Sequence, residues 1–399
     1  MKGFVFSMKS SIIRSILDTD LYKLSMAKAV LAYQQGIIVQ YIFSNRRKEG
    51  KFNISFLNAL KEQIEMMSTL TMNDSQCKWL QEKYSWLGED YIQYLKNYRF
   101  DPNEVSIKLV DNELEMEING TWERTILWEV PLMALISELY FIHCDKDWTM
   151  DAEFQIKQIQ NKAMALDKIK YTDFGTRRRR NFETQFLINQ ALLNKQKFPG
   201  YVGTSNVHIA HLLNVKAVGT MAHEWIMGIS ALEGLRHANR HALKIWSKVY
   251  HGNLGTALTD TFGTDAFYQD FDGVLARLFD SVRHDSGDPS IFTEKTISAY
   301  QKLGINPMTK SIIFSDGLDV PTVLAINKMV GGRINDSYGI GTNFTNDFGK
   351  SKPLNMVIKL FMCNGIPVVK LSDTPTKAIG DKDAVRVAKW TFFNHPLDN

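Results

Sequence analysis

From about residue 149 onward, short strand-like runs alternate with amphipathic helical stretches. Helical patterns follow the runs IKYTDFG, YVGTSN and KAVGTMAHEW, and the series continues through TALTDTFG, LFDSVRHDSGDP, SIIFSDG and SYGIGTNF. Strands that alternate with helices in this way lie parallel, because each helix returns the chain to the same end of the sheet. The pattern therefore predicts either an α/β barrel or a doubly wound sheet.

Polar residues and glycine recur where these runs end. The positions are Asp173, Ser205, His223, Asp260, Asp285, Asp316 and Gly341. A barrel gathers the carboxyl ends of all its strands around one point, whereas an open sheet spreads them apart. We therefore expect an irregular TIM-like α/β barrel over residues 149–399.

Residues 1–148 have the pattern of a separate, mixed α+β domain. Helical periodicity covers residues 18–35, 55–69, 74–86 and 88–97, and strand-like runs cover 39–43, 105–110, 113–118 and 122–128. Asp-Asn and Asn-Gly turn signals separate the last three runs. We expect an N-terminal α+β domain here, whose sheet could include strands from the C-terminal part of the chain.

The composition is that of a soluble globular protein, with 44% hydrophobic and 23% charged residues and a formal net charge of +4. The three cysteines, Cys77, Cys144 and Cys363, have no CxxC spacing, which argues against a disulfide framework or a structural zinc site. The N-terminus lacks the pattern of a signal peptide, and we expect no segment that spans a membrane. A reducing cytoplasm is the expected compartment.

A run of four arginines, Arg177–Arg180, follows the strand end at Asp173 and the aromatic Phe174. Such a run is often a solvated basic face, and one alternative is an RNA-binding patch. The other interpretation is a pocket, because an arginine beside an aromatic ring suits a planar carboxylate. The residues alone leave both interpretations open.

Several further strand-end residues carry reactive or charged groups. His223 in GTMAHEW could act as base, ligand or phosphoryl acceptor, oriented by a neighbour such as Glu224. Aspartates at these positions could cap helices, surround a polyhydroxy ligand or hold a hydrated Mg²⁺ ion; they are Asp260, Asp285 and Asp316. Arg283, and the glycine-rich segment that contains Gly341 and Thr342, could bind phosphate.

Taken in order, these segments resemble the nicotinate phosphoribosyltransferase family. The resemblance rests on LDTDLYKLSM, YIFSNR, YTDFGTRRR, GTSNVHIAH, GTMAHEW, LTDTFGTDAF, VRHDSGDP, IIFSDGLD and GIGTNFTND, which together cover almost the whole chain. It implies transfer of a phosphoribosyl group from phosphoribosyl pyrophosphate to nicotinate, coupled to ATP and assisted by Mg²⁺. It also implies a head-to-tail homodimer with active sites at the subunit boundary, and no nucleic-acid or membrane partner.

The same resemblance implies roles for individual residues. Asp20 and Tyr22 would reach the neighbouring subunit's site, where Tyr22 would stack on the pyridine ring opposite Phe174. Arg177 would face the nicotinate carboxylate, with Arg46 nearby. His223 would be the phosphorylated histidine. The remaining groups would hold the phosphoribosyl moiety: Asp260 and Asp316 beside the ribose, Arg283 and Asp285 at the sugar and pyrophosphate, and Gly341 and Thr342 at the 5′-phosphate. Lys359 and Lys370 receive no role.

Ser205 addresses the choice between related substrates. The similar nicotinamide phosphoribosyltransferases have an acidic residue at this place, which would repel nicotinate. A serine removes that repulsion and can donate a hydrogen bond to the carboxylate, so nicotinate is expected rather than nicotinamide. Quinolinate phosphoribosyltransferase is a further alternative, but it would require additional cationic groups for a dicarboxylate.

Overall fold

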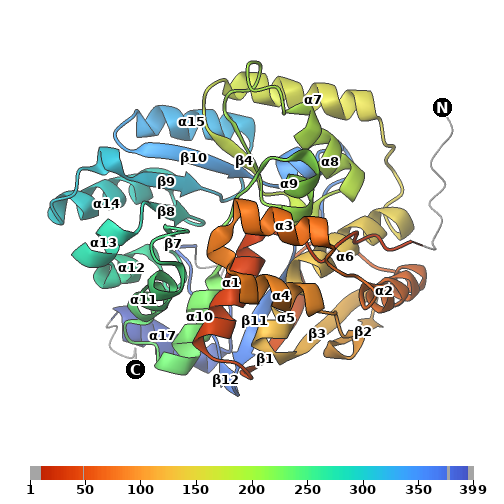
Figure 1. Ribbon diagram of the computed structural model, residues 1–399, viewed down its shortest axis with the longest axis horizontal. Coiled ribbons are helices and arrows are strands. Elements are labelled where there is room, and N and C mark those ends of the chain that lie inside the picture. Colours follow the sequence, from red (N-terminus) through yellow and green to blue (C-terminus); the bar gives the residue numbers. More distant parts are fainter. Residues whose placement is uncertain (1–9, 48, 375–377, 394–399) are drawn as a thin grey trace.

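The computed structural model describes residues 10–47, 49–374 and 378–393 and contains two sheets (Figure 1). The seven-stranded sheet has the order β6-β5-β4-β10-β9-β8-β7, and every neighbouring pair in it is parallel. Its strands are β4 (Tyr171–Asp173), β5 (Tyr201–Thr204), β6 (Lys216–Ala217), β7 (Thr256–Leu258), β8 (Ser281–His284), β9 (Ser311–Phe314) and β10 (Asn335–Ile340).

This strand order is the circular order of a barrel with one opening. The last strand, β10, pairs with the first, β4, while β6 and β7 form the two edges of the sheet. Helices connect and cover the strands: α7 (Ala152–Leu166), α8 (Phe182–Ala191), α9 (Val207–Leu213), α10 (His223–Glu233), α11 (Ala238–Tyr250), α12 (Thr264–Asp270), α13 (Gly273–Leu278), α14 (Pro289–Lys302), α15 (Val320–Val330) and α16 (Thr342–Thr345). The expectation of an irregular α/β barrel is confirmed.

The second sheet is antiparallel and has the order β12-β11-β1-β3-β2. Its strands are β1 (Ile38–Asn45), β2 (Val105–Val110), β3 (Glu113–Thr121), β11 (Met356–Cys363) and β12 (Ile366–Pro367). Two of them, β11 and β12, come from the C-terminal part of the chain. Because β11 pairs with β1 along most of its length, the end of the chain is built into the N-terminal sheet.

Helices and short 3₁₀ turns pack around this sheet. They are α1 (Leu21–Tyr33), α2 (Ile54–Met67), α3 (Asp74–Lys83), α4 (Glu89–Asn97), α5 (Trp122–Thr125), α6 (Glu129–His143), Ser85–Leu87 and Pro102–Glu104. Two further 3₁₀ turns, Thr176–Arg178 and Pro307–Thr309, lie in the barrel, and α17 (Lys382–Phe393) is the last described helix. The helices predicted from periodicity are therefore present, with ends that differ by a few residues.

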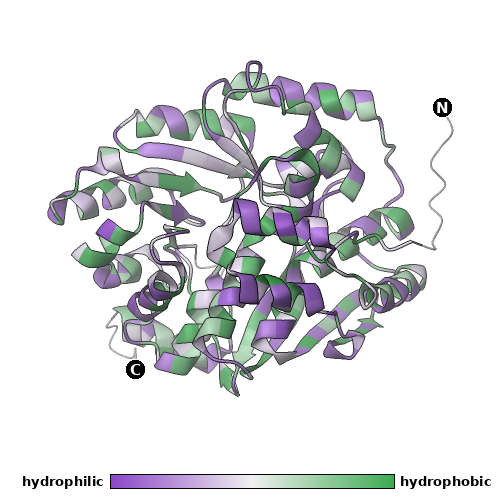
Figure 2. Cartoon of the chain, viewed as in Figure 1, coloured by the Kyte–Doolittle hydropathy of each residue, from purple (hydrophilic) through white to green (hydrophobic). Residues whose placement is uncertain are grey.

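The β2–β3 hairpin shows how the sequence specifies this sheet. Asp111 and Asn112 both have positive φ, at 51° and 61°, which a two-residue hairpin turn of the primed type requires. Along β3 exposed and buried residues alternate, and Figure 2 shows the matching alternation of hydrophilic and hydrophobic residues. The turn signal and the two-residue periodicity thus gave the correct hairpin.

The strand expected at residues 122–128 is wrong, because the segment forms α5 and the turn into α6. Its aromatic and β-branched residues favour a strand locally, but Trp122 and Trp128 are fully buried, and packing decides the conformation. Within the described residues, Trp122–His143 is also long and apolar enough to cross a membrane, contrary to our expectation. Nearly all of that stretch is buried in the protein, as is common for a core helix.

A buried ion pair ties the barrel to the N-terminal segment. Arg179 donates to both carboxylate oxygens of Asp18, at 2.6 and 2.9 Å, and its Nε donates to Glu138 at 2.8 Å. The Arg179 and Asp18 side chains have no exposed surface. The three groups therefore depend on one another for their charge compensation.

We expect Arg179→Met to lower the free energy of unfolding by about 3–5 kcal/mol, because it leaves two carboxylates buried without their cation. Thermal denaturation measures the effect. The matched control is Arg386→Met, whose side chain is 69% exposed and which should change stability by less than about 0.5 kcal/mol. Equal melting temperatures for the two variants would contradict a structural role for Arg179.

Candidate active site

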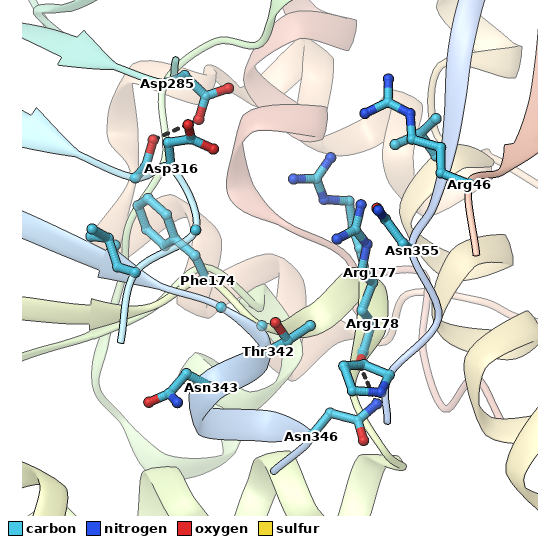
Figure 3. A pocket seen from close by; sticks show the side chains of 18 of the residues that line it. Arg46, Phe174, Arg177, Arg178, Asp285, Asp316, Thr342, Asn343, Asn346 and Asn355 are labelled. Atoms are coloured by element: carbon cyan, nitrogen blue, oxygen red, sulfur yellow. Dashed lines mark hydrogen bonds between the residues drawn. The ribbon is translucent and has the colours of Figure 1, made fainter. Parts of the chain in front are cut away.

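A cavity of about 610 Å³ opens at the carboxyl ends of the parallel strands and is closed on one side by β11. Figure 3 shows its polarity: the carboxylates of Asp285 and Asp316 lie on one side, and the guanidinium groups of Arg46, Arg177 and Arg178 lie opposite. A ligand that carries both a partially cationic centre and anionic groups would match this division of charge.

The acidic wall is built around Asp285, which follows β8. Its Oδ1 accepts a hydrogen bond from Ser315 Oγ at 2.8 Å and lies 3.2 Å from Arg283 Nη2. Burial alone would raise the pKa of Asp285, but the charge on the nearby Arg283 guanidinium group outweighs that effect, and the pKa falls to about 2. Asp285 is therefore a carboxylate throughout the physiological pH range.

His223 is the first residue of α10 and lines the cavity. Its Nε2 lies 2.8 Å from Asp260 Oδ1 and 3.7 Å from Asp285 Oδ2. Burial and the charge on Lys370 lower the pKa of His223, although Asp260 opposes the change. The imidazole is therefore neutral at pH 7, with Nε2–H donating to Asp260 and the lone pair on Nδ1.

Asp260 has a different place from the one expected at the ribose. It is fully buried and does not line the cavity; its Oδ2 accepts from Ser286 Oγ at 2.6 Å and lies 3.0 Å from Lys370 Nζ. Both oxygens are therefore engaged inside the protein. Asp260 instead orients the imidazole of His223 through their hydrogen bond.

Glu224 was expected to orient His223, and this expectation is also wrong. Its Oε1 accepts hydrogen bonds from Tyr41 Oη at 2.5 Å and Trp122 Nε1 at 2.9 Å, and its Oε2 accepts from Lys23. Neighbouring residues at the start of a helix point in different directions, so the residue next in sequence cannot reach the imidazole in this geometry.

The basic wall includes groups that sequence reasoning missed. Arg178, the neighbour of Arg177 in the arginine run, donates twice to the carbonyl of Met356, which fixes it against β11. Lys359 on β11 also lines the cavity, and burial followed by the positive charge of Arg46 lowers its pKa to about 7. Only the pairing of β1 with β11 brings Lys359 to the barrel, and no local motif shows that pairing.

Phe174 and Arg177 both line the cavity, as the pocket interpretation predicts. Arg177 Nη1 lies 3.5 Å from Glu129 Oε1, and its side chain is 42% exposed. A Cβ atom on Gly339 would lie 2.2 Å from the Phe174 ring. Gly339 therefore makes room for the aromatic ring, whereas the sequence suggested only phosphate binding for this glycine-rich segment.

The phosphate-binding candidates lie at the base of the cavity. Gly341 and Thr342 both line it, at the start of α16, and Figure 3 shows Thr342 below Phe174. Arg46 lines the basic wall, and Arg283 lies beside Asp285. The structure thus brings these four residues to one cavity with Asp316 and His223.

Asp20, Tyr22 and Ser205 do not line this cavity. Ser205 Oγ donates to Asp20 Oδ1 at 2.7 Å, and both side chains are buried in their own chain. Burial raises the pKa of Asp20 to about 6, an effect that Arg177 and Ser205 limit. Ser205 Oγ is thus engaged by Asp20 and does not line the cavity, contrary to its expected contact with a substrate carboxylate. The reach of Asp20 and Tyr22 into a neighbouring subunit's site stays a prediction, because it concerns contacts with a second subunit.

The arginine run does not form an exposed basic patch. Arg179 and Arg180 are buried, and Arg180 lies among the rings of Phe141, Phe348 and Trp148, 3.5–4.8 Å from their centroids. Charges that are already enclosed by aromatic rings and carboxylates are not available to a nucleic acid. The RNA-binding alternative therefore loses the surface on which it depended.

Comparisons with known proteins identify the family of this chain. The model of the nicotinate phosphoribosyltransferase (NAPRTase) family matches residues 169–396, and that of the nicotinate phosphoribosyltransferase N-terminal domain matches residues 17–137. A nicotinate phosphoribosyltransferase of Methanosarcina mazei is 45% identical, covering 97% of this chain and 100% of its own length. Nicotinate phosphoribosyltransferase 2 of Pseudomonas aeruginosa is 42% identical, covering 96% and 97%.

Solved structures give the same result. The crystal structure of nicotinate phosphoribosyltransferase from Porphyromonas gingivalis superposes with a TM-score of 0.91 at 37% identity, covering 95% of this chain and 99% of that one. This similarity extends over nearly the full length of both chains. On sequence and structure together, the chain belongs to the nicotinate phosphoribosyltransferase family.

Proposed function

We propose that this enzyme transfers the phosphoribosyl group of phosphoribosyl pyrophosphate to nicotinate and couples the transfer to ATP through phosphorylation of His223. The observation that carries the proposal is one cavity that contains an aromatic ring beside an arginine, carboxylates on the opposite wall, and a neutral histidine held by Asp260. Family membership supports the transferase activity. The roles of single residues and the ATP coupling are the proposed part.

Nicotinate would lie between Phe174 and the basic wall. Arg177 retains exposed guanidinium surface, so it can donate to the ring carboxylate, while Phe174 supplies an apolar face for the pyridine. The pyridine nitrogen has a lone pair and carries no proton at pH 7, so no residue has to act as a base. The protein therefore contributes mainly by aligning the nitrogen with C1 of the ribose.

The carboxylates of Asp285 and Asp316 would stabilise the sugar. As the bond from C1 to pyrophosphate breaks, the ribose becomes oxocarbenium-like, and fixed negative groups beside it lower the energy of that state. The cations Arg46, Arg178 and Lys359 on the opposite wall would receive the anionic leaving group. The backbone near Gly341 and the Thr342 hydroxyl would hold the 5′-phosphate.

Mg²⁺ fits the acidic wall. This ion prefers one or two carboxylates together with substrate phosphates, and Asp285 and Asp316 offer that donor set in the cavity. Asp260 does not fit, because Lys370, Ser286 and His223 already engage it. Bound there, Mg²⁺ would neutralise phosphate charge in the substrates.

The tautomer of His223 supports its role as the phosphoryl acceptor. The Nδ1 lone pair would attack the γ-phosphorus of ATP, and ADP would leave with the electron pair of the broken P–O bond. Asp260 would stabilise the charge that appears on the ring, as it accepts from Nε2–H at 2.8 Å. Water would later break the P–N bond and release phosphate, which would draw a readily reversible transfer toward nicotinate mononucleotide.

Labelling with γ-labelled ATP tests this proposal. The purified enzyme should incorporate label into the peptide that contains His223, and the bond should be labile in acid and stable in base. Addition of nicotinate and phosphoribosyl pyrophosphate should discharge the label as nicotinate mononucleotide forms. A stable label elsewhere, or discharge without product, would contradict the phosphohistidine route.

Gly339→Ala tests the place of the pyridine ring. The added Cβ would lie 2.2 Å from Phe174 and force that ring to move. We expect the KM for nicotinate to rise roughly tenfold and stability to fall by about 1–3 kcal/mol, the usual cost of overpacking. Steady-state kinetics and thermal denaturation provide the measurements, with Ser337→Ala on the same strand as the control. An unchanged KM for nicotinate would contradict stacking of the pyridine ring on Phe174.

The homodimer stays a prediction that light scattering can test. The predicted contribution of Asp20 and Tyr22 to a neighbouring subunit's site belongs to the same prediction. A monomer with full activity would contradict a site completed by two subunits.

A further inference from the structure

A chain of four alternating charges, three of which line the cavity, joins both parts of the protein. Lys23 on α1 lies between Glu129, the first residue of α6, and Glu224, the second residue of α10. Glu129 in turn lies next to Arg177. The order Arg177, Glu129, Lys23, Glu224 alternates positive and negative charge and has no net charge.

Lys23 is the most enclosed member of this chain. Its side chain has no exposed surface, and its Nζ lies 2.5 Å from Glu129 Oε2 and also contacts Glu224 Oε2. Both carboxylates line the cavity, whereas Lys23 itself does not. A lysine this deeply buried is expected only where anions compensate its charge.

The two contacts of Glu129 are unequal. Its Oε2 lies 2.5 Å from Lys23, whereas its Oε1 lies 3.5 Å from Arg177 Nη1. The nearer cation therefore holds the carboxylate. Arg177 keeps 42% of its side chain exposed and has guanidinium donors that can face the cavity.

We propose that Lys23 is a positioning residue that sets the affinity for the acidic substrate, because it holds Glu129 away from Arg177. This inference rests on the proposed role of Arg177 in binding nicotinate. Glu129 and the substrate carboxylate are both anions that compete for the same guanidinium group. When Lys23 neutralises Glu129, the guanidinium group of Arg177 is available to the substrate carboxylate.

The position of Lys23 also explains why two carboxylates can lie beside an anion-binding pocket. Without the lysine, Glu129 and Glu224 would face each other in a buried space as like charges. Glu129 would then turn to its remaining cation and form a close, two-point pair with Arg177. Nicotinate would have to break that pair in order to bind.

Lys23→Met tests the inference, because methionine has nearly the same length and no charge. We expect the KM for nicotinate to rise roughly tenfold to a hundredfold, the scale of one charge-assisted hydrogen bond. The KM for phosphoribosyl pyrophosphate and kcat should change by less than about threefold. The matched control is Lys28→Met on the same helix, whose ammonium donates to the Trp86 carbonyl and which should leave both KM values unchanged.

The double variant Lys23→Met with Glu129→Gln separates positioning from folding. It removes one charge of each sign, so Arg177 has no competing anion, and the nicotinate KM should return to within about threefold of the wild-type value. If Lys23 only stabilised the fold, the double variant would be no better than the single one. That result, or an unchanged nicotinate KM in Lys23→Met, would overturn the inference.

If Lys23→Met does not fold, Glu129→Gln alone gives the answer. Loss of the anion beside Arg177 should lower the nicotinate KM severalfold, and a rise would overturn the inference. Wild-type enzyme in the same assay keeps the two proposals distinct. If wild type makes no nicotinate mononucleotide, the proposed function fails; if wild type is active and the variants differ from these expectations, only the role of Lys23 fails.

Discussion

His223→Ala is expected to abolish ATP coupling while leaving a slow transfer that does not depend on ATP. Loss of the only proposed phosphoryl acceptor should reduce ATP hydrolysis by about a thousandfold or more, since no other group takes the place of a missing nucleophile. Attack of the pyridine nitrogen on the ribose uses no atom of His223, so basal transfer should persist. Parallel assays of ADP release and nicotinate mononucleotide formation, with and without ATP, measure the two activities.

His251→Asn is the matched control for this variant. His251 is an exposed histidine with a left-handed backbone, φ 48°, which asparagine adopts readily. Both activities should be retained. An equal loss of ATP hydrolysis and ATP-independent transfer in His223→Ala, at unchanged melting temperature, would contradict the phosphohistidine role and place His223 in the transfer step itself.

Arg177→Met is expected to reduce kcat/KM for nicotinate roughly 30- to 1,000-fold, the range for loss of one partner from a desolvated charge pair. The KM for phosphoribosyl pyrophosphate should change far less, because that substrate meets the other cations of the basic wall. Steady-state kinetics with each substrate varied in turn measure the difference. Nicotinamide, which has no carboxylate, should be affected least.

Arg177→Lys provides the comparison. Lysine keeps the charge but lacks the planar pair of donors, so it should recover only part of the lost activity. If Arg177→Met affected nicotinate and phosphoribosyl pyrophosphate equally, Arg177 would not recognise the nicotinate carboxylate.

Much of the fold could be predicted because it is encoded locally. The alternation of strands and helices predicted the parallel sheet. The polar residues at strand ends predicted much of the cavity lining, including His223, Asp285 and Asp316. Each of these residues follows a strand of a curled sheet, so topology alone brings them together. The Asp111–Asn112 turn likewise gave its hairpin correctly.

The parts that could not be predicted depend on tertiary packing. Residues 122–128 look like a strand, but burial of two tryptophans in a helical segment overrides that local preference. Lys359 joins the basic wall only because β11 pairs with β1, more than 300 residues away in the chain. Nothing in the local sequence indicates such a pairing.

The differences at Asp260 and Ser205 share one cause. Sequence reasoning assumed that every polar side chain at a strand end faces the cavity, yet Asp260 and Ser205 are buried and satisfied by other protein groups. A buried carboxylate must find donors wherever the fold supplies them. For Asp260 these donors are His223, Ser286 and Lys370, which turns an expected substrate contact into support for the histidine.

The most direct test is to supply purified enzyme with phosphoribosyl pyrophosphate, Mg²⁺ and either nicotinate or nicotinamide, and to quantify the mononucleotide formed with and without ATP. The arginine-lined cavity and the proposed phosphorylation of His223 predict efficient formation of nicotinate mononucleotide, stimulation by ATP, and little or no product from nicotinamide. Equal use of the uncharged amide, or no product from nicotinate, would contradict this account.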